Sequence, residues 1–410
     1  MSGIKNGVVG RQAGNVQGIL LVSIGLLSTM AVILLAPAVP VMMRAFSHVP
    51  GYAQLVVFSL TCPALCVAII SPFIGAIIDM MGRRKLLIGA LIAYPILGTA
   101  PLYLTSLTEI IVSRLGVGIA EAVLLGASIT MLGDFFTDHE REKFLAINTA
   151  IASLSATAFF AVGGLLASHD WRAPYAVYSV AILFLIAVIA FTWEPPSHRT
   201  HKELSQVATS GGSFPFLRFF LICLITIAGA IIFMIPQIEI GVISAAHGFK
   251  SPAVAGIVGA IGSAAMPVGA FVFNWLRKHK VKLSSLVIVA FSLGGLGLIL
   301  MAMVSTVPLL VLGMIVHEFG CGFMLTGLMI WVLGFLTYEY RGKGTGAYFS
   351  SFFIGQPIAG FLFGFVQHKF GGDAIMSFYS FGIAALVVAG LLVVAKIARI
   401  ADENKTVQEV

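Results

Sequence analysis

Residues 75–85 read Gly-Ala-Ile-Ile-Asp-Met-Met-Gly-Arg-Arg-Lys and separate two hydrophobic runs, each long enough to cross a bilayer. Asp79 ends the first run, Gly82 gives the backbone the freedom for a tight reversal, and Arg83 begins a basic triplet that opens the second run. A generic cytoplasmic loop does not require this order of residues. The stretch therefore predicts a short connection of defined shape between two membrane helices.

The composition is that of a membrane protein. Hydrophobic residues make up 59% of the chain and charged residues 10%, with a mean hydropathy of +1.03, whereas about 25% of residues are charged in soluble domains. A soluble fold cannot hide so much apolar surface, but a lipid bilayer solvates it. We therefore predict an all-α membrane protein with twelve transmembrane helices. They are expected at residues 18–41, 53–78, 86–105, 108–133, 144–168, 172–193, 216–246, 253–275, 284–304, 307–336, 344–368 and 374–398.

The distribution of Lys and Arg predicts the orientation. With the N-terminus inside, 19 of the 24 basic residues fall in cytoplasmic segments, four fall outside and Arg114 lies within a helix. By the positive-inside rule both termini are cytoplasmic, so the net charge of +7 directs insertion and indicates no nucleic-acid partner. The first apolar run lacks a clear cleavage site and is expected to be a membrane helix. We expect a multi-pass protein of the cell membrane, the inner membrane in a bacterium.

The chain is predicted to consist of two halves. The longest polar stretch, residues 194–213, separates six predicted helices from six and has the composition of a cytoplasmic linker. We expect six-helix bundles at residues 1–193 and 216–410, joined by a linker at 194–215. Segments 133–143 and 333–343, which are 200 residues apart, share Thr, Arg and Lys in register. Such a repeat is typical of membrane proteins that are built from two similar halves.

Several motifs carry a family resemblance. Residues 75–85 resemble the signature loop between helices 2 and 3 of the major facilitator superfamily (MFS) of secondary transporters. Residues 36–40, Ala-Pro-Ala-Val-Pro, resemble the proline-bearing end of helix 1 in twelve-helix drug:proton antiporters, and residues 114–122 resemble the R-x-x-x-G-x-x-E/Q pattern of helix 4. The resemblance implies two pseudo-symmetric six-helix bundles that alternate access to a central site, and we expect a monomer. One departure is that Phe159-Phe160 stand where antiporters usually carry a Gly-Pro pair, ahead of Gly163-Gly164.

Ionisable side chains inside a bilayer need a reason, because each costs roughly 2.5–3.5 kcal/mol at a helix centre on insertion scales. Four firmly ionisable residues lie deep in the predicted helices: Arg114, Glu121, Glu239 and Glu318. His317 adds a fifth titratable group. A carboxylate withdrawn from water exchanges a proton near neutral pH, and histidine titrates there unaided. We therefore expect proton coupling, with Glu121 and Glu318 as leading carriers and Glu239 and His317 behind them. Sodium coupling and permanent structural networks are the alternatives.

The spacing of these residues predicts where they point. Arg114 and Glu121 are seven residues apart, two helical turns, and are expected to face the same cavity. Under the 200-residue offset Glu318 overlays Gly118, about one turn before Glu121. Two carboxylates would then approach the centre from pseudo-symmetric helices. His317 points about 100° away from Glu318, so only one of the two is expected to face the cavity.

The remaining site predictions concern binding and conformational change. Pro236 and Gly241 predict a bent or unwound helix beside Gln237 and Glu239, a gate or binding element, with a hydrated outer position of Glu239 as the alternative. The predicted substrate-binding residues are Arg114, Gln237, Tyr348, Gln356 and Asn148. In the family, the acid and arginine of the signature loop contact the start of helix 11 in the outward-facing state. That resemblance assigns conformational roles to Gly75, Asp79, Gly82, Arg83 and Arg84.

No other chemistry is indicated. A phosphate-binding glycine loop is missing, so direct ATP drive is unsupported. Cys and His residues lack metal-ligand spacing, and we expect neither a metal nor a cofactor. An enzyme would need polar catalytic residues at one membrane surface, and none cluster there. Our first choice is proton-coupled export of amphipathic organic compounds. Alternatives are proton-coupled uptake of an organic anion held by Arg114, and lysolipid transport, because residues 118–122 are similar to helix 4 of spinster-like transporters.

Overall fold

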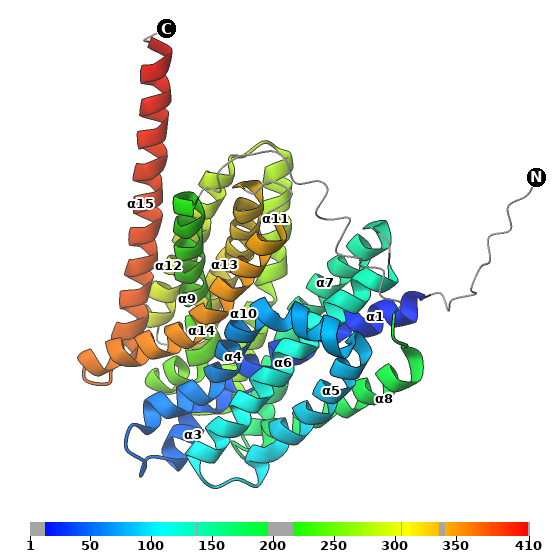
Figure 1. Cartoon of the computed structure of the whole chain (residues 1–410). Helices are drawn as coiled ribbons and strands as arrows, with labels where there is room; N and C mark the ends of the chain where they lie inside the picture. Colours follow the sequence, from blue (N-terminus) through cyan, green and yellow to red (C-terminus); the bar gives the residue numbers. More distant parts are fainter. Residues whose placement is uncertain (1–12, 137, 196–215, 305, 336–340, 409–410) are drawn as a thin grey trace, which may run out of the picture.

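The computed structural model describes residues 13–136, 138–195, 216–304, 306–335 and 341–408. These residues form helices joined by short turns, with no strand among them. The predicted all-α fold is confirmed. Helices α9–α15 group on one side of the molecule and α3–α6 with α8 on the other (Figure 1).

Every membrane helix predicted in the first half has a counterpart. The elements are α1 (Asn15–Ser23), α2 (Gly25–Ile33), η1 (Ala36–Ala38), α3 (Val39–Ala45), α4 (Tyr52–Met81), α5 (Arg83–Thr99), η2 (Ala100–Leu102), α6 (Leu107–Phe135), α7 (Asp138–Ala167), η3 (Ala173–Val180) and α8 (Ala181–Phe191), where η denotes a 3₁₀-helix.

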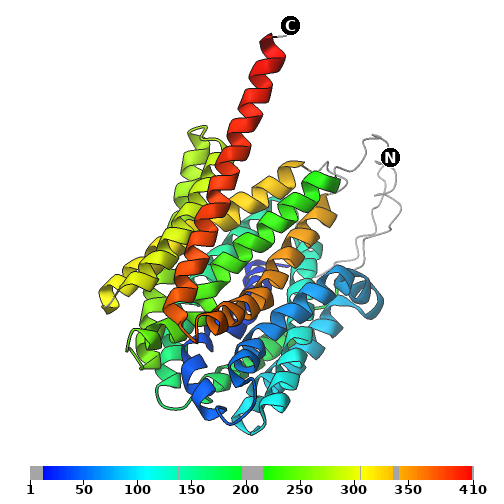
Figure 2. The same ribbon diagram turned by 90° about the vertical axis from the view of Figure 1, so that its left-hand side faces the viewer.

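The second half is built in the same way. Its elements are α9 (Phe216–Ala246), α10 (Pro252–Ser263), α11 (Ala265–Lys278), α12 (Leu283–Met303), α13 (Val307–Phe335), α14 (Arg341–Lys369) and α15 (Ala374–Gln408). The C-terminal end of α15 projects beyond the other helices in both views (Figures 1 and 2). Within the described residues, 11 helical segments are long and apolar enough to cross a membrane, and the shorter apolar part of α7, Leu154–Ala167, completes the predicted twelve. The chain is a multi-pass membrane protein.

Prolines have opposite effects in two of these helices. The first membrane segment, predicted as one helix, narrows to a 3₁₀ turn at Ala36–Ala38 and restarts at Val39, because Pro37 and Pro40 together remove two helical N–H donors. By contrast α9 continues through Pro236 as one helix, so of the predicted bend or unwinding beside Glu239 the unwinding is wrong, and the bend remains a prediction. A single proline removes one hydrogen bond, and neighbouring helices hold the rest of a membrane helix in shape.

The two halves pack tightly at one end. We call the end of each helix that the Lys and Arg distribution places in the cytoplasm its inner end, and the opposite end its outer end. Near the outer end of α7, a Cβ atom at Gly164 would lie 2.7 Å from the Cα atom of Gly256 in α10, and one at Gly163 would collide with the carbonyl oxygen of Leu34. Deeper along the same two helices, the hydroxyls of Thr157 and Ser263 are 3.0 Å apart. Glycine thus permits backbone contact between the halves, and the outer end is closed.

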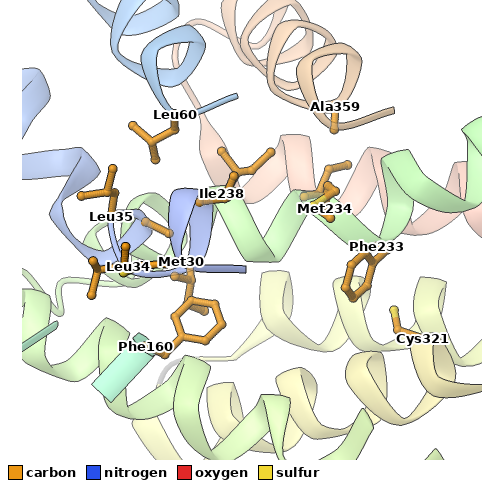
Figure 3. Close-up of a cluster of buried hydrophobic side chains, with 14 of the residues drawn as sticks. Met30, Leu34, Leu35, Leu60, Phe160, Phe233, Met234, Ile238, Cys321 and Ala359 are labelled. Carbon is orange, nitrogen blue, oxygen red and sulfur yellow. The ribbon is translucent and has the colours of Figure 1, made fainter. Parts of the chain in front are cut away.

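The broken first helix lies in the middle of this contact. Leu34 and Leu35 are buried, and Figure 3 places them near Leu60 of α4 and Phe160 of α7. Ile238 of α9 approaches the same group from the second half (Figure 3). In addition, α4 packs along α14 across the boundary between the halves. The core is therefore continuous from one half to the other at this level.

Candidate functional site

A cavity of about 270 Å³ lies between the halves, and its two walls differ. The wall formed by α9 and α14 is aromatic and carries Phe233, Tyr348, Phe349, Phe352 and Phe353. The wall formed by α2 and α7 carries small side chains: Ser28, Thr29, Ala31, Ala152 and Ala156. Apolar side chains dominate the lining, and a few polar groups interrupt it. This is the usual character of a site for small organic molecules.

Glu121 reaches the cavity from α6, with 2% of its surface exposed. The Ser28 side chain lies within hydrogen-bonding reach of this carboxylate, and Glu121 Oε2 is buried without a partner in the described structure. A buried oxygen without a donor is costly for a carboxylate. The site is therefore suited to hold a proton on Glu121.

Glu318 reaches the same cavity from α13 and is fully buried. Gln237 of α9 donates a hydrogen bond from Nε2 to Glu318 Oε1 over 2.8 Å. The second oxygen of each side chain, Gln237 Oε1 and Glu318 Oε2, is buried without a partner in the part of the chain that the structure describes. The repeat had placed Glu121 and Glu318 at a common cavity, and the structure brings both to it.

His317 is fully buried and does not line the cavity. Its Nδ1 lies 3.0 Å from the carbonyl oxygen of Gly294 on α12, and because that oxygen only accepts, Nδ1 carries the hydrogen. Nε2 is 3.3 Å from Cys321 Sγ. His317, Glu318 and Cys321 form a group of metal-ligand type, with ligand atoms within 4.8 Å. Both ring nitrogens are already engaged within the protein, so we assign His317 to the packing of α13 against α12.

Arg114 does not face the cavity, and the prediction that it shares one with Glu121 is wrong. Its Nη2 donates to the carbonyl oxygen of Ala31 over 3.1 Å and to the hydroxyl of Tyr178 over 2.7 Å. The guanidinium carbon lies 4.9 Å from the centre of the Tyr178 ring and 5.9 Å from that of Tyr175. These tyrosines of η3 stabilise the cation through their ring faces. Helical spacing predicts a shared face but gives no information about a partner on another helix.

Three further predicted residues occupy different places. Tyr348 and Gln356 line the cavity, and the Tyr348 hydroxyl donates to the carbonyl oxygen of Leu325 over 3.2 Å. Asn148 lines a separate small pocket beside Gly25, so its predicted role in the main cavity is not supported. Glu239 is 1% exposed and does not line the cavity, which excludes the hydrated outer position considered as an alternative.

The signature loop is held by two acids, Asp134 of α6 and Glu194, which follows α8. Gly82 has φ +91°, a conformation that favours glycine. The Arg83 side chain pairs with Asp134 over 3.1 Å. The Glu194 carboxylate accepts hydrogen bonds from the backbone N–H groups of Arg83 over 2.6 Å and of Arg84 over 3.0 Å, and so caps α5. The sequence analysis missed Asp134 and Glu194. An acid directly following a membrane helix was the available signal.

The other members of the loop add little to this arrangement. A Cβ atom on Gly75 would meet nothing within 4 Å. The side chains of Asp79 and of the start of α14, around Lys343, lie outside the described residues. The predicted contact between the loop and helix 11 therefore remains a prediction.

Comparison with known proteins decides the family. The model of the Major Facilitator Superfamily matches residues 21–359. The chain belongs to this superfamily. It is therefore a membrane transporter and not an enzyme.

Two curated relatives of this superfamily member are transporters by name, one of them an export protein. Cephamycin export protein CmcT of Amycolatopsis lactamdurans is 29% identical over 182 residues, which are 42% of this chain and 37% of that protein. Multidrug transporter protein MdtP of Bacillus subtilis (strain 168) is 28% identical over 121 residues, which are 29% of this chain and 22% of that protein. The matches thus cover well under half of each relative.

Solved structures of the superfamily share the fold. The nucleoside transporter NupG (TM-score 0.72, 12% identity) is covered over 98% of its chain and 93% of this one. A D-xylose-proton symporter (0.72, 16%) is covered over 96% of its chain and 92% of this one. A bacterial homolog to the human lysosomal transporter Spinster, in an inward-facing and occupied conformation (0.69, 14%), is covered over 94% of its chain and 93% of this one. At these identities the likeness shows the fold alone.

Proposed function

We propose that this MFS protein is a proton-coupled exporter of amphipathic organic compounds. It works as a monomer by alternating access between the bundles at residues 1–193 and 216–410. One observation carries the proposal: a largely apolar cavity between the halves holds two buried carboxylates, Glu121 and Glu318, with no Lys or Arg among its described lining residues. Arg114 lies behind the wall near Glu121, so within the described lining itself protons are the positive charges that the two carboxylates can bind when no substrate is present.

The two carboxylates are the proposed proton carriers. Both are buried, and each has one oxygen without a hydrogen-bond partner in the described structure. Removing a charge from water favours its neutral form, so protonation is linked to whether the cavity is open to water. Alternating access changes that exposure. Glu239, buried away from the cavity, is third in rank, and His317 is the weakest of the four candidates.

The cargo is proposed from the walls of the cavity. Phe233, Phe352 and Phe353 offer ring faces to an apolar or aromatic group, while Gln356 and the two carboxylates offer polar partners. The names of the two curated relatives, an export protein and a multidrug transporter, agree with export. Uptake of an organic anion is less favoured, because Arg114, its proposed clamp, is engaged with Tyr178.

The proposed location is the cell membrane, the inner membrane in a bacterium, with both termini in the cytoplasm. Membrane-impermeant thiol labelling tests this orientation. Ser205→Cys in the linker should react in inverted vesicles and not in intact cells. Cysteine at Ser47, in the loop after α3, should show the opposite pattern. Reaction of the linker from outside intact cells would overturn the topology.

Proton coupling is tested in proteoliposomes with an imposed pH gradient. A substrate is first found by screening lipophilic cations, aromatic acids and lysolipids for ligands that raise the unfolding temperature of purified protein, because a ligand stabilises the state it binds. Uphill transport of that ligand should vanish when the gradient is dissipated. Concentrative transport that persists with Gln at positions 121, 239 and 318 would rule out the proposed carriers.

A further inference from the structure

Gln237 and Glu318 are in direct contact, and each side chain is a planar fork of two heteroatoms on one carbon. One edge is joined, because Gln237 Nε2 donates to Glu318 Oε1 over 2.8 Å. The other two atoms are Gln237 Oε1 and Glu318 Oε2, and both are buried without a hydrogen-bond partner in the described structure. Both are acceptors when Glu318 is ionised. Two unpaired buried acceptors in neighbouring side chains are unfavourable together.

One proton removes this deficit. A carboxylic acid with its hydrogen on Oε2 becomes a donor, and the amide oxygen of Gln237 is the acceptor that lacks one. A carboxylic acid and a carboxamide joined in this way share two hydrogen bonds, one in each direction. One hydrogen atom on Glu318 Oε2 would thus supply the donor that Gln237 Oε1 lacks.

The surroundings provide no other compensation for a charge on Glu318. The titratable groups near it are His317 and Cys321 of its own helix, Tyr348 of α14 and, across the cavity, Glu121. Glu239 of α9 lies away from the cavity. Helices α10 and α12 contain no ionisable residue, and those of α11, Arg277 and Lys278, lie at its inner end. No described cation faces the carboxylate, so a proton is the species that neutralises it.

The pair lies next to the weakest turn of α9. Pro236, the preceding residue, lacks the N–H that would bond to the carbonyl oxygen of Ile232. Beyond this turn, the outer part of α9 packs on the broken first helix of the other half: a Cβ atom at Gly241 would lie 2.8 Å from the carbonyl oxygen of Ala36. The hydrogen bond between Gln237 and Glu318 holds α9 against α13. It therefore also fixes the outer part of α9, which closes the outer end.

We propose that Gln237 is the positioning residue for the proton of Glu318 and links that proton to the closed outer end. With the proton bound, the doubly hydrogen-bonded pair holds the outer part of α9 in the arrangement seen here. Without it, both oxygens remain buried and unpaired, the pair opens, and the outer part of α9 is released at Pro236. This inference rests on the proposed binding of a proton at Glu318. Proton binding therefore favours closure of the outer end. This direction fits an antiporter, in which protons bound from outside drive the return to the state that is closed outside.

Spin labels across the outer end test the inference without transport. Ser47→Cys, after α3, and Lys250→Cys, after α9, are both exposed positions, and the partly exposed Cys66 and Cys223 are changed to alanine. In the otherwise unaltered protein, raising the pH should populate a longer label distance. The net free energy of one hydrogen bond corresponds to a change of about twofold to tenfold in the ratio of open to closed forms.

Two variants should act in opposite directions. Glu318→Gln supplies a permanent N–H for Gln237 Oε1, so without substrate the short distance should predominate and should no longer respond to pH. Gln237→Leu removes both hydrogen bonds, so the longer distance should be populated at every pH. Gln237→Asn, which retracts the amide by one carbon, should match Gln237→Leu if the latter does not fold. Thr226→Val is the control, because Thr226 is a buried polar residue of α9 that bonds only within its own helix, to Ile222, among the contacts described.

The outcomes separate this inference from the proposed function. A normal pH response in Gln237→Leu and Gln237→Asn, or a shift of both pair variants in the same direction, would overturn the role of Gln237. If Glu318 remains necessary for uphill transport in that case, the proposed function stands and only the inference fails. Loss of the pH response in Thr226→Val would show that removing any buried polar side chain from α9 has this effect. That result would also overturn the inference.

Discussion

Nη2 of Arg114 lies 2.7 Å from the hydroxyl oxygen of Tyr178, so a guanidinium buried in the membrane region bonds to a phenol of the same half of the protein. Its Nε and Nη1 have no partner in the described structure. The cation is thus retained by a hydroxyl, a carbonyl and two aromatic rings. This makes Arg114 a structural residue of the first half.

Tyr178→Phe is therefore expected to destabilise the protein while leaving ligand binding intact. The change removes one hydrogen bond from a buried charge, and the unfolding free energy should fall by about 1–3 kcal/mol. Thermal unfolding in detergent, with and without ligand, measures both effects. Tyr103→Phe, at an exposed tyrosine, is the matched control and should change nothing. Stabilisation by carboxylate ligands that disappears in Arg114→Ala would instead support anion uptake.

Glu318→Gln is expected to abolish uphill transport and to retain exchange of substrate down its own gradient. The amide cannot carry a transported proton, but it preserves the shape of the cavity wall. Glu121→Gln should behave in the same way if both protons are coupled. The measurement compares pH-driven uptake into proteoliposomes with counterflow. Glu109→Gln, at the first turn of α6, is the control acid and should transport normally. Full uphill transport by both cavity variants would contradict the assignment.

Gly164→Val is expected to prevent closure of the outer end. The added side chain would meet the backbone of Gly256 in α10, and overpacking of this kind costs about 1–3 kcal/mol, or up to roughly a hundredfold in the balance between states. Thiol labelling of cysteines introduced into the cavity wall should then become faster from the outside. Gly390→Ala provides the comparison, because a Cβ atom there meets nothing within 4 Å. Unchanged labelling in Gly164→Val would show that α7 and α10 are not the closing surface.

Glu194→Gln is expected to loosen the inner end of α5. The carboxylate accepts from two backbone N–H groups, at Arg83 and Arg84, and its charge lies at a helix N-terminus, which together are worth about 1–2 kcal/mol. Hydrogen exchange at residues 83–86 should accelerate, and the difference should shrink at high salt. Glu109→Gln again serves as the control. Equal protection of residues 83–86 against hydrogen exchange in both variants would show that the Glu194 cap does not stabilise α5.

The sequence was sufficient for the helical architecture because membrane helices are encoded by long apolar runs. It also placed Glu121 and Glu318 at one cavity, since an internal repeat relates positions in one half to positions in the other. Arg114 was misplaced because the tyrosines that hold it come from η3, about sixty residues later in the chain. Periodicity describes one helix, whereas the partner of a buried charge is decided by packing between helices.

Prolines illustrate the same limit. Pro37 and Pro40 break the first helix, yet α9 runs through Pro236 and α4 runs through Pro63 and Pro72. The local chemistry of each proline is identical. What differs is how many donors are lost within one turn and which neighbours support the backbone there. Similarly, Asn148 belongs to the right helix but faces Gly25 instead of the main cavity. These contacts between helices cannot be predicted from the local pattern of a single sequence.

The glycine contact between α7 and α10 has a consequence for the electrical properties of the membrane. Where Gly164 and Gly256 face each other, main chain meets main chain and no side chain stands between them. A file of water molecules, and hence a wire for hopping protons, needs a channel at least one water wide. At this seam the closed end leaves none. If the cavity carboxylates carry protons as proposed, this backbone contact provides electrical insulation along α7 and α10, because it excludes the water file through which protons would hop.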